Sequence, residues 1–177
     1  MNIPNKLTLL RVILVPVFVI MMFKGMYLYS LLIFCLASFT DTLDGFIARR
    51  YKLVTNFGKL MDPLADKVLV IAAIVIFIDF DWCPSWVLIV ILAREFLVAG
   101  VRQVAATNGV VIAADIFGKL KTITQMIWII IRLFCQAFLF VPSWLYQSNF
   151  VFMYISVILT IISGFNYSIK NKQVFNQ

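Results

Sequence analysis

Six long apolar runs follow one another along the chain, and short polar segments separate them. Each run is long enough to cross a bilayer as a helix. The runs lie roughly at Leu7–Phe23, Tyr27–Ile47, Leu64–Phe80, Trp86–Ala106, Thr122–Val141 and Phe150–Ile169. The pattern predicts an all-α protein with six transmembrane helices and leaves fewer than about sixty residues for loops and ends. We therefore expect a single membrane domain over residues 1–177.

The composition agrees with membrane insertion. Of the 177 residues, 63% are apolar and 13% are charged, whereas a soluble domain has about 45–50% apolar and about 25% charged residues. Histidine is absent, which excludes His-based acid–base catalysis and the usual zinc sites. The three cysteines form no CxxC pair, so we interpret them as packing residues. The net charge of +7 is spread along the chain, and nucleic acid is not an expected partner.

Lysine and arginine are unevenly distributed between the connections. Both ends of the chain, the second-to-third connection and the fourth-to-fifth connection carry most of them. The other three connections carry Lys24, then Asp79 and Asp81 without a base, then no charge. Because cytoplasmic loops are enriched in Lys and Arg, this asymmetry predicts that both termini face the cytoplasm.

Four aspartates lie within 26 residues, near the cytoplasmic ends of the second and third runs: Asp41, Asp44, Asp62 and Asp66. Within each pair the spacing is three or four, so both members share a helix face. A carboxylate inside a bilayer costs about 2.5–3.5 kcal/mol on insertion scales, and four together repel one another unless protons or cations neutralise them. An all-oxygen cluster suits two hard cations such as Mg²⁺ or Mn²⁺, which clamp oxygens in phosphoryl-type displacements. A bond from each aspartate to a neighbouring helix is the plainer alternative.

Small and basic residues surround these aspartates at fixed intervals. Glycine lets a ligand or another backbone approach closely, although ordinary helix packing explains the glycines about as well. Residues 41–66 follow the pattern D-x2-D-G-x2-A-R-x8-G-x3-D-x3-D, which resembles the signature of the CDP-alcohol phosphatidyltransferases. The resemblance implies the CDP-alcohol phosphotransferase fold with six membrane helices, homodimers and two divalent cations. It also implies attack of an alcohol on a CDP-linked phosphate with release of CMP.

The resemblance also implies a role for each matching residue. Asp41 and Asp62 would bridge both metal ions, Asp44 would complete one metal site, and Asp66 would complete the other and act as the catalytic base. The residues expected to bind CDP-diacylglycerol are Asn5, Thr8, Gly45, Ala48, Arg49, Thr55 and Gly58. Asn5 and Thr8 match an N-x-x-T element of the family, and helix capping explains these two equally well.

Basic residues in and beside the fourth and fifth runs favour an anionic acceptor: Arg94, Arg102, Lys119 and Lys121. A charge inside a span needs a partner, which for Arg94 is the acceptor, Glu95 or an aspartate of the site. Positive-inside anchoring alone explains the two lysines. The segments 1–11, 94–106 and 109–122 resemble bacterial family members that use sn-glycerol 3-phosphate. This implies synthesis of phosphatidylglycerophosphate at the cytoplasmic face of the bacterial inner membrane, with membrane lipid as surroundings.

Alternatives of two kinds stay open. Within the family, the alternative acceptors are phosphatidylglycerol (for cardiolipin synthesis), serine and an inositol phosphate. From another class, a small cation transporter would use the aspartates without releasing CMP, but it leaves the spacing of Gly45, Arg49 and Gly58 unexplained. A purely structural subunit is disfavoured by the cost of four acids. Arg132, deep in the fifth run, has no role that the sequence assigns.

Overall fold

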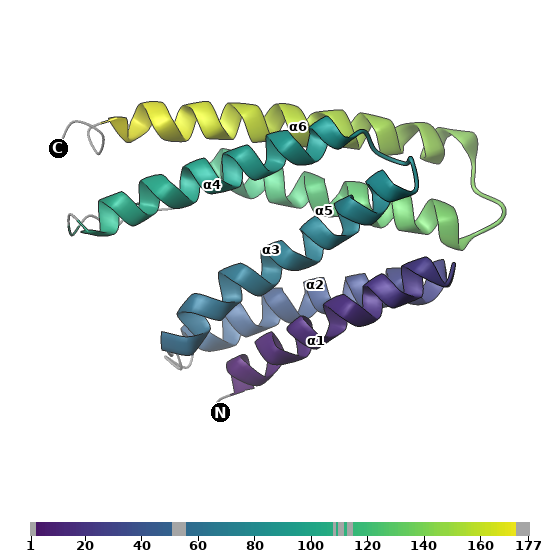
Figure 1. Cartoon of the computed structure of the whole chain (residues 1–177), viewed down its shortest axis with the longest axis horizontal. Coiled ribbons are helices and arrows are strands. Elements are labelled where there is room, and N and C mark those ends of the chain that lie inside the picture. Colours follow the sequence, from purple (N-terminus) through teal and green to yellow (C-terminus); the bar gives the residue numbers. More distant parts are fainter. Residues whose placement is uncertain (1–2, 51–55, 108, 110–111, 113–114, 173–177) are drawn as a thin grey trace. The chain divides into compact units, whose positions relative to one another are not determined.

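A computed structural model of the chain consists mainly of six helices (Figure 1). It describes residues 3–50, 56–107, 109, 112 and 115–172, and the side chains of residues 8–40, 67–107, 109, 112 and 115–172. The helices are α1 (Ile3–Phe23), α2 (Tyr27–Arg50), α3 (Asn56–Asp79), α4 (Ser85–Thr107), α5 (Ile116–Ala137) and α6 (Ser143–Lys170). The predicted all-α class and the six helical segments are confirmed.

The helix ends differ from the ends of the apolar runs. α3 begins at Asn56, well before Leu64, and α5 begins at Ile116 rather than Thr122. Hydropathy marks the apolar middle of a helix, so it misses polar first turns. α5 ends at Ala137 rather than Val141. The aspartate pair of the third run therefore lies inside a helix and does not open it.

Of the described residues, one helix passes a test of length and hydropathy for crossing a membrane, namely α6. Shorter apolar helical stretches cover Thr8–Phe23 and Tyr27–Thr40. α4 carries Arg94, Glu95 and Arg102 within its length, and such charges lower its hydropathy. The prediction of six membrane spans therefore rests on the number of helices and the family resemblance, and the orientation stays a prediction.

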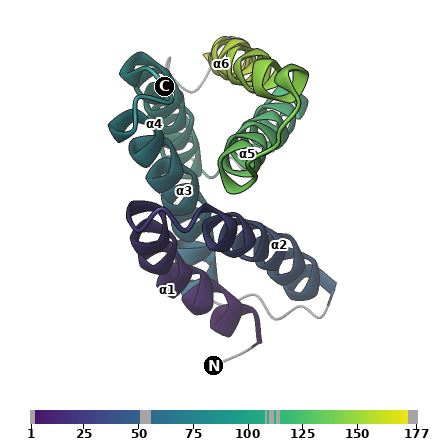
Figure 2. The same cartoon turned by 90° about the vertical axis from the view of Figure 1, so that its right-hand side faces the viewer.

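The chain divides into two compact units. The first unit contains Met1–Trp82 and Ile129–Pro142, and the second contains Cys83–Trp128 and Ser143–Gln177. In the first unit, α1 packs against α2 and α3, and α2 contacts α3 (Figure 2). The rings of Phe18 on α1 and Phe34 on α2 are fully buried, with centroids 5.9 Å apart. The single domain expected for residues 1–177 stays a prediction.

In the second unit, α4 packs along α6 (Figure 1). The buried face of α4 is apolar and includes Ile91, Val98 and Val101. The buried face of α6 is rich in small and polar residues, namely Asn149, Ser156, Thr160, Ser163, Gly164 and Tyr167. Membrane helices associate through such residues, because lipid is as apolar as leucine and gives apolar faces no reason to pair.

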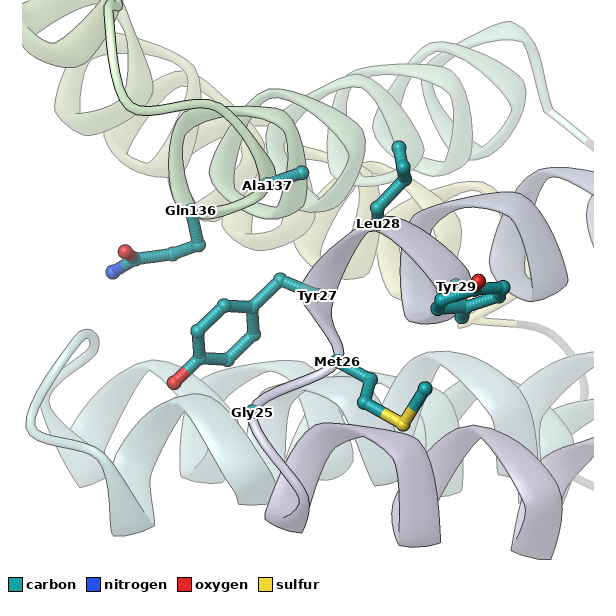
Figure 3. Close-up of a pocket in the computed structure, with 7 residues that line it drawn as sticks. All are labelled: Gly25, Met26, Tyr27, Leu28, Tyr29, Gln136 and Ala137. Atoms are coloured by element: carbon teal, nitrogen blue, oxygen red, sulfur yellow. The ribbon is translucent and has the colours of Figure 1, made fainter.

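A surface hollow of about 210 Å³ lies in the first unit, beside the turn between α1 and α2 (Figure 3). Its walls are Gly25, Met26, Tyr27, Leu28 and Tyr29, with Gln136 and Ala137 from the end of α5. Gly25 has a φ of 70°, a conformation that glycine adopts readily. None of these seven residues is charged. The hollow therefore lacks the groups that a diphosphate and metal ions require, and it is not the candidate active site.

Candidate active site

The two aspartate pairs lie on two helices of the first unit that contact each other. Asp41 and Asp44 belong to α2, and Asp62 and Asp66 belong to α3. Their spacings of three and four place each pair of positions on one face of its helix. Their side chains lie outside the described residues, as do those of Asn5, Gly45, Ala48, Arg49 and Gly58, and Thr55 lies outside altogether. The close fit of these residues to a ligand therefore stays a prediction.

The donor set itself fits a pair of hard cations. Four carboxylates on two contacting helices offer only oxygen ligands, which Mg²⁺ prefers. Among the residues whose side chains the structure describes, no three acids, cysteines or histidines gather into a metal site. The four aspartates therefore stay the candidate ligands.

Thr8 and Arg11 lie three residues apart on α1, and both are buried. Each has an interaction partner in the structure. A fully buried guanidinium in an apolar helix is costly unless it is paired, so Arg11 has a specific role in the first unit. The sequence signal was a base one helical turn after Thr8.

Arg94, Glu95 and Lys121 form an ion cluster in the second unit, in which Lys121 is buried and the other two residues are half-buried. Lys121 Nζ lies 2.7 Å from Glu95 Oε1, and Arg94 Nη1 donates to the same oxygen at 3.0 Å. The exposed fractions of the side chains are 13%, 15% and 5% for Arg94, Glu95 and Lys121. Two cations share one acid, so the ion cluster keeps one positive charge. The pairing of Arg94 with Glu95, one of the alternatives from the sequence, is confirmed.

Arg94 also contacts α5 and α6. Its Nη2 donates to Ser163 Oγ at 2.6 Å. A Cβ added to Gly118 would lie 3.0 Å from Arg94 Nη2, and one added to Gly164 would lie 3.2 Å from Arg94 Cγ. Arg94 Nε is buried and has no hydrogen-bond partner among the described residues. The arginine is thus enclosed by three helices and keeps one buried donor for a further acceptor.

The other two predicted acceptor residues lie outside the ion cluster. Arg102 is exposed on α4, where its Nε donates to Tyr167 Oη at 3.1 Å and its guanidinium lies 5.6 Å from the centre of the Tyr167 ring. Lys119 is exposed, whereas Lys121 is buried. Residues two apart on a helix do not share a face, which explains why the lysines differ. Of the four bases, the structure brings together only Arg94 and Lys121.

Asp115, which the sequence analysis missed, ties the start of α5 to the end of α6. Its carboxylate accepts hydrogen bonds from Asn166 Nδ2 at 2.5 Å and from Lys170 Nζ at 3.2 Å. Burial alone would raise the pKa of Asp115, but hydrogen bonds from Lys170, the Ile116 backbone and Asn166, together with the Lys170 charge, hold the pKa below its ordinary value. Asp immediately before a helix is a common N-cap, and this was the available signal.

Arg132, which the sequence left without a role, lies in the first unit. It is buried, and its guanidinium carbon lies 4.5 Å from the centre of the Trp82 ring. This is a cation–π contact, which an arginine can make with an aromatic face in an apolar environment. The contact gives Arg132 a structural partner near the C-terminal end of α5.

The chain belongs to the CDP-alcohol phosphatidyltransferase family, whose model matches residues 1–162. It is 41% identical to a Bacillus subtilis protein named CDP-diacylglycerol–glycerol-3-phosphate 3-phosphatidyltransferase, over 96% of this chain and 95% of the relative. Relatives with the same name from Rickettsia typhi and Salmonella typhimurium are 37% and 36% identical. They align with 94% of this chain, and 94% and 92% of their own lengths are covered.

Proposed function

We propose that this protein transfers the phosphatidyl group of CDP-diacylglycerol to sn-glycerol 3-phosphate. The products are phosphatidylglycerophosphate and CMP, and the reaction belongs to phosphatidylglycerol synthesis. The observation that carries the proposal is near-full-length identity of 36–41% to relatives named for this reaction. The surplus positive charge of the ion cluster supports a phosphate-bearing acceptor over the zwitterion serine.

The donor half of the reaction is assigned to the first unit. Asp41 and Asp62 would hold both metal ions, with Asp44 on one and Asp66 on the other. Two Mg²⁺ or Mn²⁺ ions supply neutralisation of the diphosphate and stabilisation of the leaving CMP. The residues proposed to hold CDP-diacylglycerol are Asn5, Thr8, Gly45, Ala48, Arg49, Thr55 and Gly58. What supports this assignment is the match of residues 41–66 to the family signature on two contacting helices.

The acceptor half is assigned to the second unit. Arg94 and Lys121 would hold the phosphate of sn-glycerol 3-phosphate, and Arg102 and Lys119 would add positive charge nearby. Asp66 would take the proton of the primary hydroxyl as its oxygen bonds to the lipid-side phosphorus. The bond from that phosphorus to the CMP oxygen breaks, and CMP leaves with the electron pair. No step requires a histidine, and the chain has none.

The membrane arrangement is also part of the proposal. All six helices would cross the bacterial inner membrane with both termini and the active site on the cytoplasmic side, and two copies would form a homodimer. The distribution of Lys and Arg between the connections supports the orientation. Single cysteines at the exposed positions Lys119 and Asp81 test it. A reagent that cannot cross the membrane should label the cysteine at position 81 from outside and should not label the one at position 119. The reverse pattern would contradict the orientation.

Release of CMP from CDP-diacylglycerol tests the reaction itself. Purified protein with Mg²⁺ should release CMP when sn-glycerol 3-phosphate is present and much less when it is replaced by serine, an inositol phosphate or phosphatidylglycerol. EDTA should abolish the release, and Mg²⁺ or Mn²⁺ should restore it. Turnover with another acceptor alone would refute the proposed substrate. Cation flux without CMP release would favour the transporter alternative.

A further inference from the structure

Two of the three guanidinium nitrogens of Arg94 donate hydrogen bonds to residues on different helices. Nη1 donates to Glu95, its neighbour on α4, and Nη2 donates to Ser163 on α6. Because a guanidinium is planar and its N–H groups form a rigid fork, two anchors on separate oxygens set the plane of the whole group. One of those anchors belongs to another helix, so the direction in which Arg94 presents its remaining donors depends on α6.

Ser163 differs from its hydroxyl-bearing neighbours on α6. Thr160 and Ser168 donate to the carbonyls of Ser156 and Gly164 on their own helix, the usual arrangement for such residues. Ser163 is fully buried, and its Oγ accepts from Arg94. The Ser163 hydroxyl therefore links α6 to a charged group on α4.

Glycines enclose the same arginine on two sides. A methyl at Gly118 or Gly164 would approach Arg94 to 3.0 or 3.2 Å, whereas a methyl at Gly100 on α4 would meet nothing within 4 Å. Glycine inside a helix is less favourable than alanine, so the two glycines beside Arg94 have a local reason that Gly100 lacks. They leave space for the observed position of Arg94.

Arg94 Nε is one of the donors of this guanidinium that make no hydrogen bond to the described residues. It is buried, and no hydrogen-bond partner for it lies in the described part of the chain. Buried N–H groups are nearly always paired, and an anionic oxygen is the strongest partner for a guanidinium. We propose that Ser163 is a positioning residue that fixes the Arg94 guanidinium, with Gly118 and Gly164, so that the donors of Arg94 meet the phosphate of the acceptor. This inference rests on the proposed function.

The test compares Ser163→Ala with Ser156→Ala. Both serines are fully buried on α6, but the Ser156 hydroxyl has no hydrogen-bond partner among the described residues. Ser163→Ala should raise KM for sn-glycerol 3-phosphate about tenfold, the lower end of what a hydrogen bond to a charged group contributes. KM for CDP-diacylglycerol should stay at the wild-type value, and the midpoint of thermal unfolding should fall only slightly, because one buried hydrogen bond is lost. Ser156→Ala should change none of these three quantities.

A second pair of variants tests the glycines. Gly164→Ala should raise KM for sn-glycerol 3-phosphate because the new methyl displaces Arg94, and Gly100→Ala should not. If Gly164→Ala fails to fold, the serine pair still decides. An unchanged acceptor KM in Ser163→Ala would overturn the positioning role, as would equal rises for both substrates or a loss of thermal stability alone. A wild-type protein that releases no CMP with sn-glycerol 3-phosphate would instead refute the proposed function.

Discussion

The two charged regions of this molecule differ in how their charges are balanced. In the first unit, the segment 41–66 holds four aspartates, and four acids of one sign require cations to stay ionised at membrane depth. In the second unit, the ion cluster contains its own counter-ion, since Glu95 contacts both Arg94 and Lys121. Under the proposed function, the first region would be neutralised by metal ions from solution. The three residues of the second region carry a single net positive charge, and under the proposed function this charge would face the phosphate of the acceptor.

Removing the proposed base should give the largest effect. Asp66→Asn keeps the shape of the side chain but removes its basicity and one metal ligand. CMP release should fall by at least about 10²–10⁴-fold, the range for loss of general-base catalysis, while CDP-diacylglycerol still binds. Asp79→Asn, at the other end of α3, is the matched control and should leave the rate unchanged. Full activity of Asp66→Asn would show that the first region does not carry the chemistry.

The two lysines of α5 test the ion cluster of the second unit. Lys121→Ala removes a buried partner of Glu95, whereas Lys119→Ala removes an exposed charge. KM for sn-glycerol 3-phosphate should rise about 10- to 100-fold in the first variant, the value of a buried hydrogen bond to a charged group, and less than about threefold in the second, as for an exposed charge. Steady-state kinetics with each substrate varied in turn provides the measurement. Equal effects of the two variants would contradict the role of burial.

The smallest effect concerns Asp115, which lies outside the proposed chemistry. Its pKa is lower in the folded protein than in the unfolded chain, so its stabilising contribution is present above the unfolded pKa of about 3.9 and is lost as the pH falls through the folded value. Asp115→Asn should lower the thermal midpoint by about 1–3 °C at pH 7, as expected for a weak surface ion pair. The gap should narrow as the pH falls below about 3.9, and a gap that widens in acid would contradict the assignment.

The two regions also differ in what the sequence could predict about them. The aspartates are spaced by helical repeats on two consecutive helices, so their faces and their chemistry follow from residue numbers alone. The contacts of Arg94 with Ser163 and of Lys121 with Glu95 join residues 69 and 26 positions apart. No local spacing encodes such pairs, because they depend on how α4, α5 and α6 pack.

Individual residues show the same limit. The sequence proposed four bases for the acceptor, but only packing separates buried Lys121 from exposed Lys119 and places Arg102 on Tyr167. Hydropathy located all six helices yet missed the polar first turns of α3 and α5. Arg11 and Asp115 carried weak local signals, and their burial and partners became visible only in three dimensions.

The two anchors of Arg94 become available at different times during synthesis. Ser163 follows Arg94 by 69 positions, so at about 5–20 residues per second the ribosome makes it about 3–14 s later. Glu95 is made next after Arg94 and lies on the same helix, so it can neutralise the guanidinium before α6 exists. We expect nascent chains arrested after Pro142 to insert α4 in the wild type and to insert it less well with Glu95→Gln, as measured by protease protection. Glu95 would then stabilise Arg94 during membrane insertion, and Ser163 would hold it in the folded enzyme.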